Sequence, residues 1–222
     1  MNLRDKLLEF ASIYRFFQNV VSRRASMERI AKEHIKARRG DRVLDIGCGD
    51  SAILAFLPEV EYVGIDHNAR YIKRANQRFD TRGKFILGDA SMKDVHLDGT
   101  FDRILILSAL HHLSDELCQE TLEFARNHLS PNGILISIDP VFIEQQNVIA
   151  RWLAKNDRGK FVRDVNGYLR LFAASQFESE YCIVGDLLVV PYTNLIVTSR
   201  LSDRPAAQGN RNQLSLSTNH HV

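Results

Sequence analysis

The stretch RVLDIGCGDSAIL, residues 42–54, constrains the fold more than any other part of the sequence. An apolar run carries Asp45, Gly47 and Gly49 follow at alternate positions, and a helical pattern begins near Ser51. Glycine lets the backbone approach a ligand closely, and the helix that follows directs free N–H groups at the same point. The stretch therefore predicts a strand, a glycine-rich turn and a helix that together hold a nucleotide-like ligand.

Short apolar runs alternate with helical patterns after this turn. EYVGID, KFILGD, FDRILIL and GILISID have the pattern of strands, whereas ARYIKRANQRF and residues 115–128 have helical spacing, and helical material continues to about residue 174. This order predicts an α/β fold whose mostly parallel sheet is covered on both faces. FESEYCIVGD and PYTNLIVTSRL are too close together for a helical crossover, so we expect them to pair as antiparallel strands.

The two ends of the chain fall outside this alternation. Near the N-terminus, one helical face carries the apolar residues Leu7, Phe10, Tyr14, Phe17 and Val21, and residues 27–37 form a second helical pattern. Residues 1–40 are therefore predicted to be a helical extension that caps the site as a lid, with packing against the core as the alternative. Residues 201–222 are polar and rich in Gln, Asn and Ser, and we expect a disordered tail.

Composition and charge exclude several classes of protein. The formal net charge of +2 does not suggest a surface that follows phosphates, so we expect no nucleic-acid partner. Cys48, Cys118 and Cys182 are widely spaced, which indicates reduced thiols and neither a disulfide framework nor a metal site. No secretory signal pattern and no apolar run of about 18 residues is present. We expect a cytoplasmic protein with no integral membrane association.

Acidic residues at the ends of three predicted strands narrow the choice of ligand. Asp45 would repel a pyrophosphate but suits the ammonium group of S-adenosylmethionine. Asp66 can accept both hydroxyls of a ribose, and Asp89 in the GDA stretch can accept an adenine amine. A nicotinamide-binding G-x-G-x-x-G motif would need a glycine where Ala52 stands. The structural alternatives are a plain tight turn, a helix cap for Asp66 and a solvated loop acid for Asp89.

VLDIGCGDS, GID, GDA and LSALHHL together resemble the class I S-adenosylmethionine-dependent methyltransferases, over about residues 41–200. The resemblance implies a seven-stranded Rossmann-like methyltransferase sheet of order 3-2-1-4-5-7-6, with the last strand antiparallel, and S-adenosyl-L-methionine as cofactor. The cofactor contacts that it implies are Asp45, Gly47, Cys48, Gly49, Asp66, His67, Asp89, Ala90, Leu107 and Ser108. The family often has glycine where Ser51 stands and a small residue or threonine where Asp50 stands. We expect Ser51 to cap the helix.

The catalytic candidates lie after the fourth and fifth predicted strands. His111 and His112 belong to LSALHHLSD, and Asp139 belongs to SIDPVF, where Pro140 is expected to end the strand. Because ligands of such sheets lie beyond the carboxyl ends of the strands, His111 is the preferred general base, with His112 and Asp139 as further candidates. A purely structural histidine pair and a capping acid are the alternatives.

Residues 156–172, NDRGKFVRDVNGYLRLF, lie where this family commonly builds its acceptor pocket. Their charge would suit an anionic metabolite or a cell-surface polysaccharide or lipid precursor, although a solvated charged face is the alternative. The candidate acceptor contacts are Tyr14, Arg158, Arg163 and Tyr168. The leading hypothesis is a small-molecule methyltransferase, and the alternative is a non-catalytic S-adenosylmethionine-binding protein. The methylated atom and the oligomeric state stay open.

Overall fold

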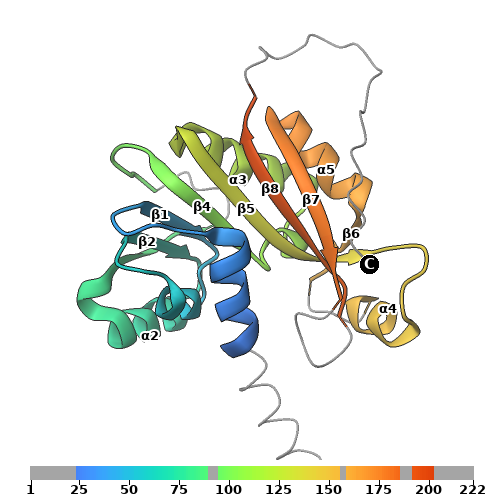
Figure 1. The fold of residues 1–222 in the computed structure, drawn as a ribbon, viewed down its shortest axis with the longest axis horizontal. Helices are drawn as coiled ribbons and strands as arrows, with labels where there is room; N and C mark the ends of the chain where they lie inside the picture. The colour runs from blue at the N-terminus through green and yellow to red at the C-terminus, as the bar shows by residue number, and fades with distance from the viewer. Residues whose placement is uncertain (1–23, 90–94, 156–158, 186–191, 203–222) are drawn as a thin grey trace, which may run out of the picture.

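The computed structural model describes residues 24–89, 95–155, 159–185 and 192–202. A single sheet crosses the molecule in the order β3-β2-β1-β4-β5-β8-β7 (Figure 1). Its strands are β1 (Arg42–Ile46), β2 (Glu61–Asp66), β3 (Gly83–Leu87), β4 (Phe101–Leu107), β5 (Leu129–Phe142), β7 (Phe177–Val184) and β8 (Asn194–Leu201).

Strands β1 to β5 pair in parallel, whereas β8 is antiparallel to both β5 and β7. A two-residue strand, β6 (Arg163–Asp164), pairs with the far end of β5. The predicted order 3-2-1-4-5-7-6 is therefore confirmed, with β7 and β8 as the predicted sixth and seventh strands. The expected helix at residues 7–21 and residues 203–222 of the expected tail lie outside the described residues, whereas Leu201, predicted to belong to that tail, is the last residue of β8.

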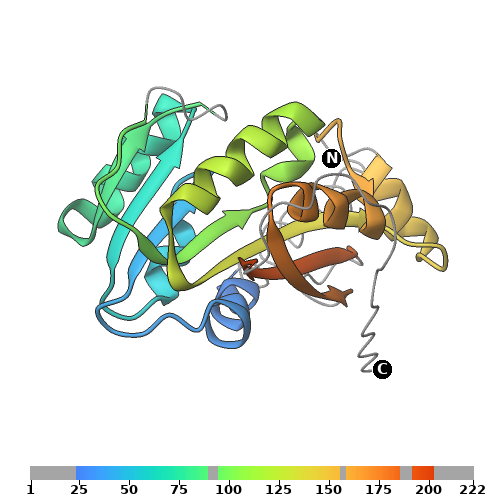
Figure 2. The ribbon, with the colours of Figure 1, turned by 90° about the horizontal axis from the view of Figure 1, so that it is seen from above.

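Helices cover both faces of the sheet. Figure 2 shows α3 (Asp115–His128) and α5 (Val165–Ala174) on one side and η1 (Ile30–Ile35) on the other. Successive residues of β4 point to opposite faces, so Ile104 and Ile106 join the core beneath α3 and α5, whereas Leu105 joins the core beneath η1. The remaining helices are η2 (Ala52–Phe56), α2 (Ala69–Phe79), η3 (Asp80–Arg82), η4 (Leu110–His112) and α4 (Val148–Lys155).

Side-chain caps mark the starts of the main helices, and those of α2 and α3 agree with their predicted positions. Asn68 accepts a hydrogen bond from the amide of Arg70 before α2, and Asp164 accepts one from Gly167 before α5. Ser114 does the same for Leu117 before α3. These caps satisfy amide donors that the first helical turn leaves without partners. They also fix where each helix leaves the carboxyl edge of the sheet.

The expected cap at Ser51 is wrong. Ser51 has the left-handed conformation with φ 54°, makes no side-chain cap hydrogen bond and precedes the short 3₁₀ helix η2. Pro58 follows two residues after this helix and opposes a longer one. The helix predicted at residues 27–37 is also altered, because residues 24–29 are α-helical and η1 continues them as a π-helix up to the left-handed Lys36.

Pro140 does not end β5, which continues to Phe142. Val141 donates its amide to the carbonyl of Thr193 on the β8 side. The missing N–H of Pro140 therefore faces the opposite side, where β4 has already ended opposite Ile138. Proline is tolerated in a strand when no neighbouring strand needs its amide. Asp139 thus lies within the strand, at the level where the parallel ladder stops.

Candidate active site

A cavity of about 560 Å³ lies at the carboxyl edge of the sheet. The glycine turn after β1, the end of β2, one face of α2 and the η4–α3 region form its wall. This volume falls within the range of about 300–1,000 Å³ that small-molecule sites occupy. The residues on the wall include Gly47, Gly49, Asp50, Asp66, His67, Tyr71, Arg74, Asp89, Ser108, His112, Leu113 and Thr121.

The glycine turn is tied to the end of β2. The amides of Gly47 and Cys48 donate to the carbonyl of Ile65 at 2.8 Å and 3.0 Å. Gly47 has φ 75°, and a Cβ atom there would lie 2.9 Å from the Cβ of Ala109, so both conformation and space require glycine. Gly49 has φ 56° with nothing within 4 Å of an added Cβ, so only its conformation favours glycine.

Asp66 joins the glycine turn to the start of α2. Its carboxylate accepts the amide of Gly49 at 2.9 Å and the amide of Asn68 at 2.8 Å. A carboxylate has about four acceptor sites, so this arrangement leaves capacity for two further donors. Because Asp66 is on the cavity wall, the two hydroxyls of a ribose fit this requirement. The residues present therefore fit a nucleoside-bearing cofactor.

Asp45, in β1, and Cys48, in the turn itself, are both buried. Asp45 is buried, and its Oδ2 accepts a hydrogen bond of 2.5 Å from the hydroxyl of Tyr62. Burial raises the pKa of Asp45 to about 7, with a smaller opposing effect from the Tyr62 hydrogen bond. Burial also raises the pKa of the Cys48 thiol far above its usual range. Neither residue lines the cavity, so the expected contact between Asp45 and an ammonium group has no direct support from the geometry.

The remaining predicted cofactor contacts occupy different positions. Ser108 has φ 59° and lies on the wall, with its amide donating to the carbonyl of Ile138 at 2.6 Å. His67 and Asp89 also line the cavity. Leu107 is the half-buried last residue of β4 and pairs with Ile138 in the sheet. Ala90 lies outside the described residues.

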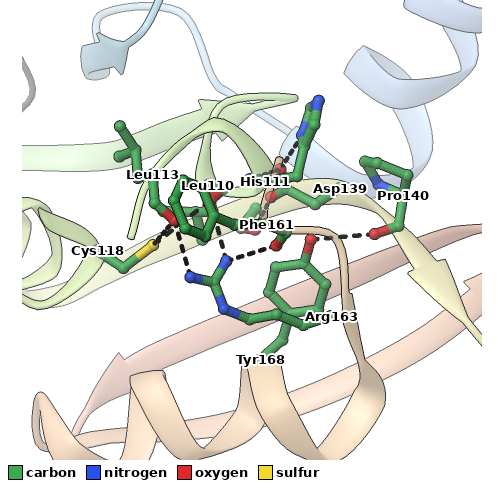
Figure 3. Close-up of polar contacts among 10 residues, drawn as sticks. Leu110, His111, Leu113, Cys118, Asp139, Pro140, Phe161, Arg163 and Tyr168 are labelled. Atoms are coloured by element: carbon green, nitrogen blue, oxygen red, sulfur yellow. Dashed lines mark hydrogen bonds and ion pairs between the residues drawn. The ribbon is translucent and has the colours of Figure 1, made fainter. Parts of the chain in front are cut away.

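The two histidines of η4 have different surroundings. His111 is 4% exposed and, like Asp139, is not on the cavity wall; its Nδ1 lies 2.8 Å from Oδ1 of Asp139, which also accepts the His111 amide at 3.1 Å. His112 is exposed, lines the cavity and lies with its ring centroid 4.0 Å from that of His111. Figure 3 shows the His111 ring directed toward Asp139. An acceptor-only carboxylate requires the Nδ1 proton, which leaves Nε2 as the basic nitrogen.

The predicted acceptor contacts Arg163 and Tyr168 do not line the cavity. All five N–H donors of the Arg163 guanidinium are used by the carbonyls of Leu110, Leu113 and Phe161 and by Asp115. Tyr168 is buried and donates its hydroxyl to the carbonyl of Pro140 at 3.1 Å (Figure 3). The polar groups of both side chains are therefore bonded within the protein. Tyr14 and Arg158 lie outside the described residues.

Sequence reasoning missed the contribution of α2 and α3 to the cavity. Tyr71 and Arg74 are three residues apart on α2 and both face the cavity, as does Thr121 on α3. The i, i+3 spacing of Tyr71 and Arg74 on a helix that follows Asp66 is the signal that would have indicated them. Gly159 was also missed, although a Cβ atom there would lie 2.0 Å from Cδ2 of His111.

Within the described residues, no group of three His, Cys, Asp or Glu side chains is arranged to hold a metal ion. Among the same residues, no helix has the length and apolar content to cross a membrane.

Comparison with solved structures agrees with this fold. The match to the DhpI–SAH complex covers 90% of this chain and 94% of the DhpI chain, with a TM-score of 0.61 and 17% identity. The match to the TehB-like SAM-dependent methyltransferase from Corynebacterium glutamicum covers 80% of this chain and 88% of that protein's chain, with a TM-score of 0.60 and 18% identity. The match to the mitomycin 7-O-methyltransferase MmcR covers 79% of this chain and 53% of that protein's chain, with a TM-score of 0.63 and 16% identity. The sheet order and the glycine turn therefore define a Rossmann-like methyltransferase fold.

A family model described as a methyltransferase domain matches residues 37–181, so the chain belongs to this S-adenosylmethionine-dependent methyltransferase family. The 27-O-demethylrifamycin SV methyltransferase of Amycolatopsis mediterranei (strain S699) is 37% identical over 106 residues, which cover 44% of this chain and 38% of the relative. Matches to three curated relatives cover 38%, 53% and 24% of their lengths.

Proposed function

We propose that this chain transfers a methyl group from S-adenosylmethionine to a hydroxyl oxygen of a small molecule. The observation that carries the proposal is the buried pair of His111 and Asp139, which holds a base at the ligand edge of the sheet, next to the ring of His112 on the cavity wall. A hydroxyl loses its proton when it is methylated, and a positioned base typically accelerates such a step about 10²–10⁴-fold. Two similar proteins are O-methyltransferases of rifamycin and mitomycin compounds by name, which supports oxygen as the methylated atom.

Each part of the site has a role in this proposal. Bound S-adenosylmethionine supplies an activated methyl group. Asp66 accepts its ribose hydroxyls, Gly47 and Gly49 let the backbone approach it, and Ser108 and His112 line its chamber. His111, whose ring contacts that of His112 on the cavity wall, is the proposed base for the acceptor proton, and Asp139 retains the Nδ1 hydrogen bond and stabilises the charged ring. Alignment and exclusion of water by the surrounding protein contribute most of the remaining acceleration.

The class of acceptor is also part of the proposal. Anion recognition by Arg163 has little support, because its donors are already used within the protein. Lys160 is exposed but does not line the cavity, so it does not support an anionic acceptor either. A hydroxylated small molecule whose proton is passed to His111 is the description that the contacts favour.

The test is methyl transfer from methyl-labelled S-adenosylmethionine to a panel of phenols, hydroxylated polyketides and sugars. We expect the wild type to release S-adenosylhomocysteine with a subset of them. His111→Gln should lose about 10²-fold or more in rate and still bind S-adenosylhomocysteine, whereas the control His128→Gln, at the other end of α3 and away from the cavity, should keep the wild-type rate. Undiminished transfer by His111→Gln would remove the base from the proposal. Cofactor binding without turnover on any acceptor would favour a non-catalytic S-adenosylmethionine-binding protein.

A further inference from the structure

Arg163 connects three segments that meet at the histidine turn. From β6, its Nη1 donates to the carbonyls of Leu110 at 3.1 Å and Phe161 at 2.9 Å, and its Nη2 donates to the carbonyl of Leu113 at 2.8 Å. Both Nε and Nη2 also contact Oδ1 of Asp115. The guanidinium side chain is only 11% exposed. Figure 3 shows it beneath the turn, directed at the carbonyls on both sides.

The carbonyls that Arg163 holds bracket the catalytic candidates. Leu110 immediately precedes His111, and Leu113 immediately follows His112. Phe161 closes the arrangement, because its amide donates to the carbonyl of His111 at 3.0 Å while its own carbonyl accepts from Arg163. A rigid planar fork with five donors can make these contacts together, and an ammonium group cannot.

The histidine turn has few internal contacts of its own. It is the three-residue 3₁₀ helix η4, with two backbone hydrogen bonds, from His112 to Ala109 and from Leu113 to Leu110. Short 3₁₀ segments have poor hydrogen-bond geometry and depend on their surroundings. The contacts that hold the turn from outside include Asp139 on one side and Arg163 with Phe161 on the other, and the weak donor Cys118 Sγ also lies 3.5 Å from the Leu110 carbonyl and 3.7 Å from that of Leu113.

We infer that Arg163 is a positioning residue for His111: by holding the carbonyls on both sides of the histidine turn, it keeps the His111 ring against Asp139. The inference rests on the proposed function, because it assigns the orientation of the base in that reaction. It differs from recognition of an anionic acceptor, the role that the sequence suggested for Arg163. It also differs from a simple ion pair, since Asp115 is 69% exposed and exposed pairs contribute little.

Three variants separate positioning from general stability. Arg163→Lys keeps the charge and removes the fork. Asp115→Asn removes the exposed ion pair and leaves the three carbonyl contacts in place. Phe172→Leu is the matched control on α5, because Phe172 is fully buried in the same core and its apolar side chain makes no hydrogen bond to the histidine turn.

The primary readout is the Nδ1–H resonance of His111 in protein labelled with ¹⁵N-histidine, assigned with His111→Gln. We expect Arg163→Lys to lose this resonance to exchange with water, and Asp115→Asn and Phe172→Leu to retain it, all below their unfolding temperatures. The affinity for S-adenosylhomocysteine should change less than about threefold in all three variants, since Arg163 does not line the cavity. With an accepted hydroxyl compound, kcat should fall about tenfold or more in Arg163→Lys alone.

The outcomes distinguish this inference from the proposed function. If Arg163→Lys keeps the His111 resonance and kcat of wild type, Arg163 is not a positioning residue, and the proposed function stands. If the Phe172→Leu control loses the resonance as well, the effect belongs to general stability, and the inference also fails. If the wild type binds neither S-adenosylmethionine nor S-adenosylhomocysteine, the proposed function itself fails.

Discussion

One carboxylate oxygen of Asp139 holds both the ring and the backbone of His111. Oδ1 accepts from Nδ1 at 2.8 Å and from the amide at 3.1 Å, while Oδ2 accepts the hydroxyl of Ser137 at 3.0 Å. The imidazole therefore cannot rotate without breaking a buried hydrogen bond. A base held in this way needs little reorganisation when the acceptor proton arrives.

Asp139→Asn tests this relationship. The amide keeps the shape of the carboxylate but can present a donor to Nδ1, which favours the wrong tautomer and places the proton on Nε2. We expect methyl transfer to fall about 10²-fold or more, with little change in the affinity for S-adenosylhomocysteine. Ser137→Ala is the control, because it removes only the contact to Oδ2 and should reduce the rate much less. Equal rates in wild type and Asp139→Asn would show that the pair is structural.

Gly159→Ala tests how closely the segment before β6 packs on the base. An added Cβ would lie 2.0 Å from Cδ2 of His111 and 2.7 Å from its carbonyl oxygen. Because these distances are far below van der Waals contact, either the ring or the segment must move. We expect a loss of methyl transfer of about tenfold or more, together with a shifted His111 ring resonance. Gly185→Ala is the control, since nothing lies within 4 Å of a Cβ there, and it should behave as wild type.

Gly47→Ala tests the close approach at the glycine turn. Its positive φ of 75° costs a non-glycine residue about 1–2 kcal/mol, and its Cβ would also press on Ala109 at 2.9 Å. Gly40→Ala is the matched control, because it has φ 85° with open space around the Cβ and does not line the cavity. Both variants should lose unfolding free energy in urea titrations, but only Gly47→Ala should weaken binding of S-adenosylhomocysteine. Equal binding by the two variants would contradict a role of the turn in holding the cofactor.

The raised pKa of Asp45 predicts that the free energy of unfolding depends on pH. Its folded pKa of about 7 lies above that of an unfolded aspartate, so the folded state binds the extra proton between about pH 4 and pH 7. This stabilisation is fully present below pH 4, and it is lost as the pH rises toward 7, by up to about 1.4 kcal/mol per pH unit. Above pH 7 no further loss follows, because both states are then ionised.

Urea unfolding of wild type and Asp45→Asn from pH 5 to pH 8.5 measures this dependence. The asparagine variant has no titrating group at this position, so the difference in unfolding free energy isolates Asp45. We expect wild type to lose stability relative to Asp45→Asn up to about pH 7, after which the difference levels off. A difference that stays constant across the whole range would show that Asp45 is already ionised in the folded protein at pH 5.

The strand ends could be predicted from the sequence because their patterns are local. Apolar runs that end in Asp66 or lead into His111 specify both the sheet and the edge on which ligands lie. The orientation of Asp45 could not be predicted, since it depends on Tyr62 in the neighbouring strand. The contacts of Arg163 with the histidine turn were also missed, because Leu110 and Leu113 are about 50 residues away in the chain and accept through backbone carbonyls, which leave no signal in a sequence.

The measurement that tests the central claim most directly is calorimetric titration of the chain with S-adenosylhomocysteine. Wild type is compared with Asp66→Ala and with Asp164→Ala, a control that removes another carboxylate bonded to a backbone amide but lies away from the cavity. We predict micromolar binding by wild type and Asp164→Ala, and binding weakened about tenfold or more by Asp66→Ala. A folded wild type that binds neither S-adenosylhomocysteine nor S-adenosylmethionine would contradict the account.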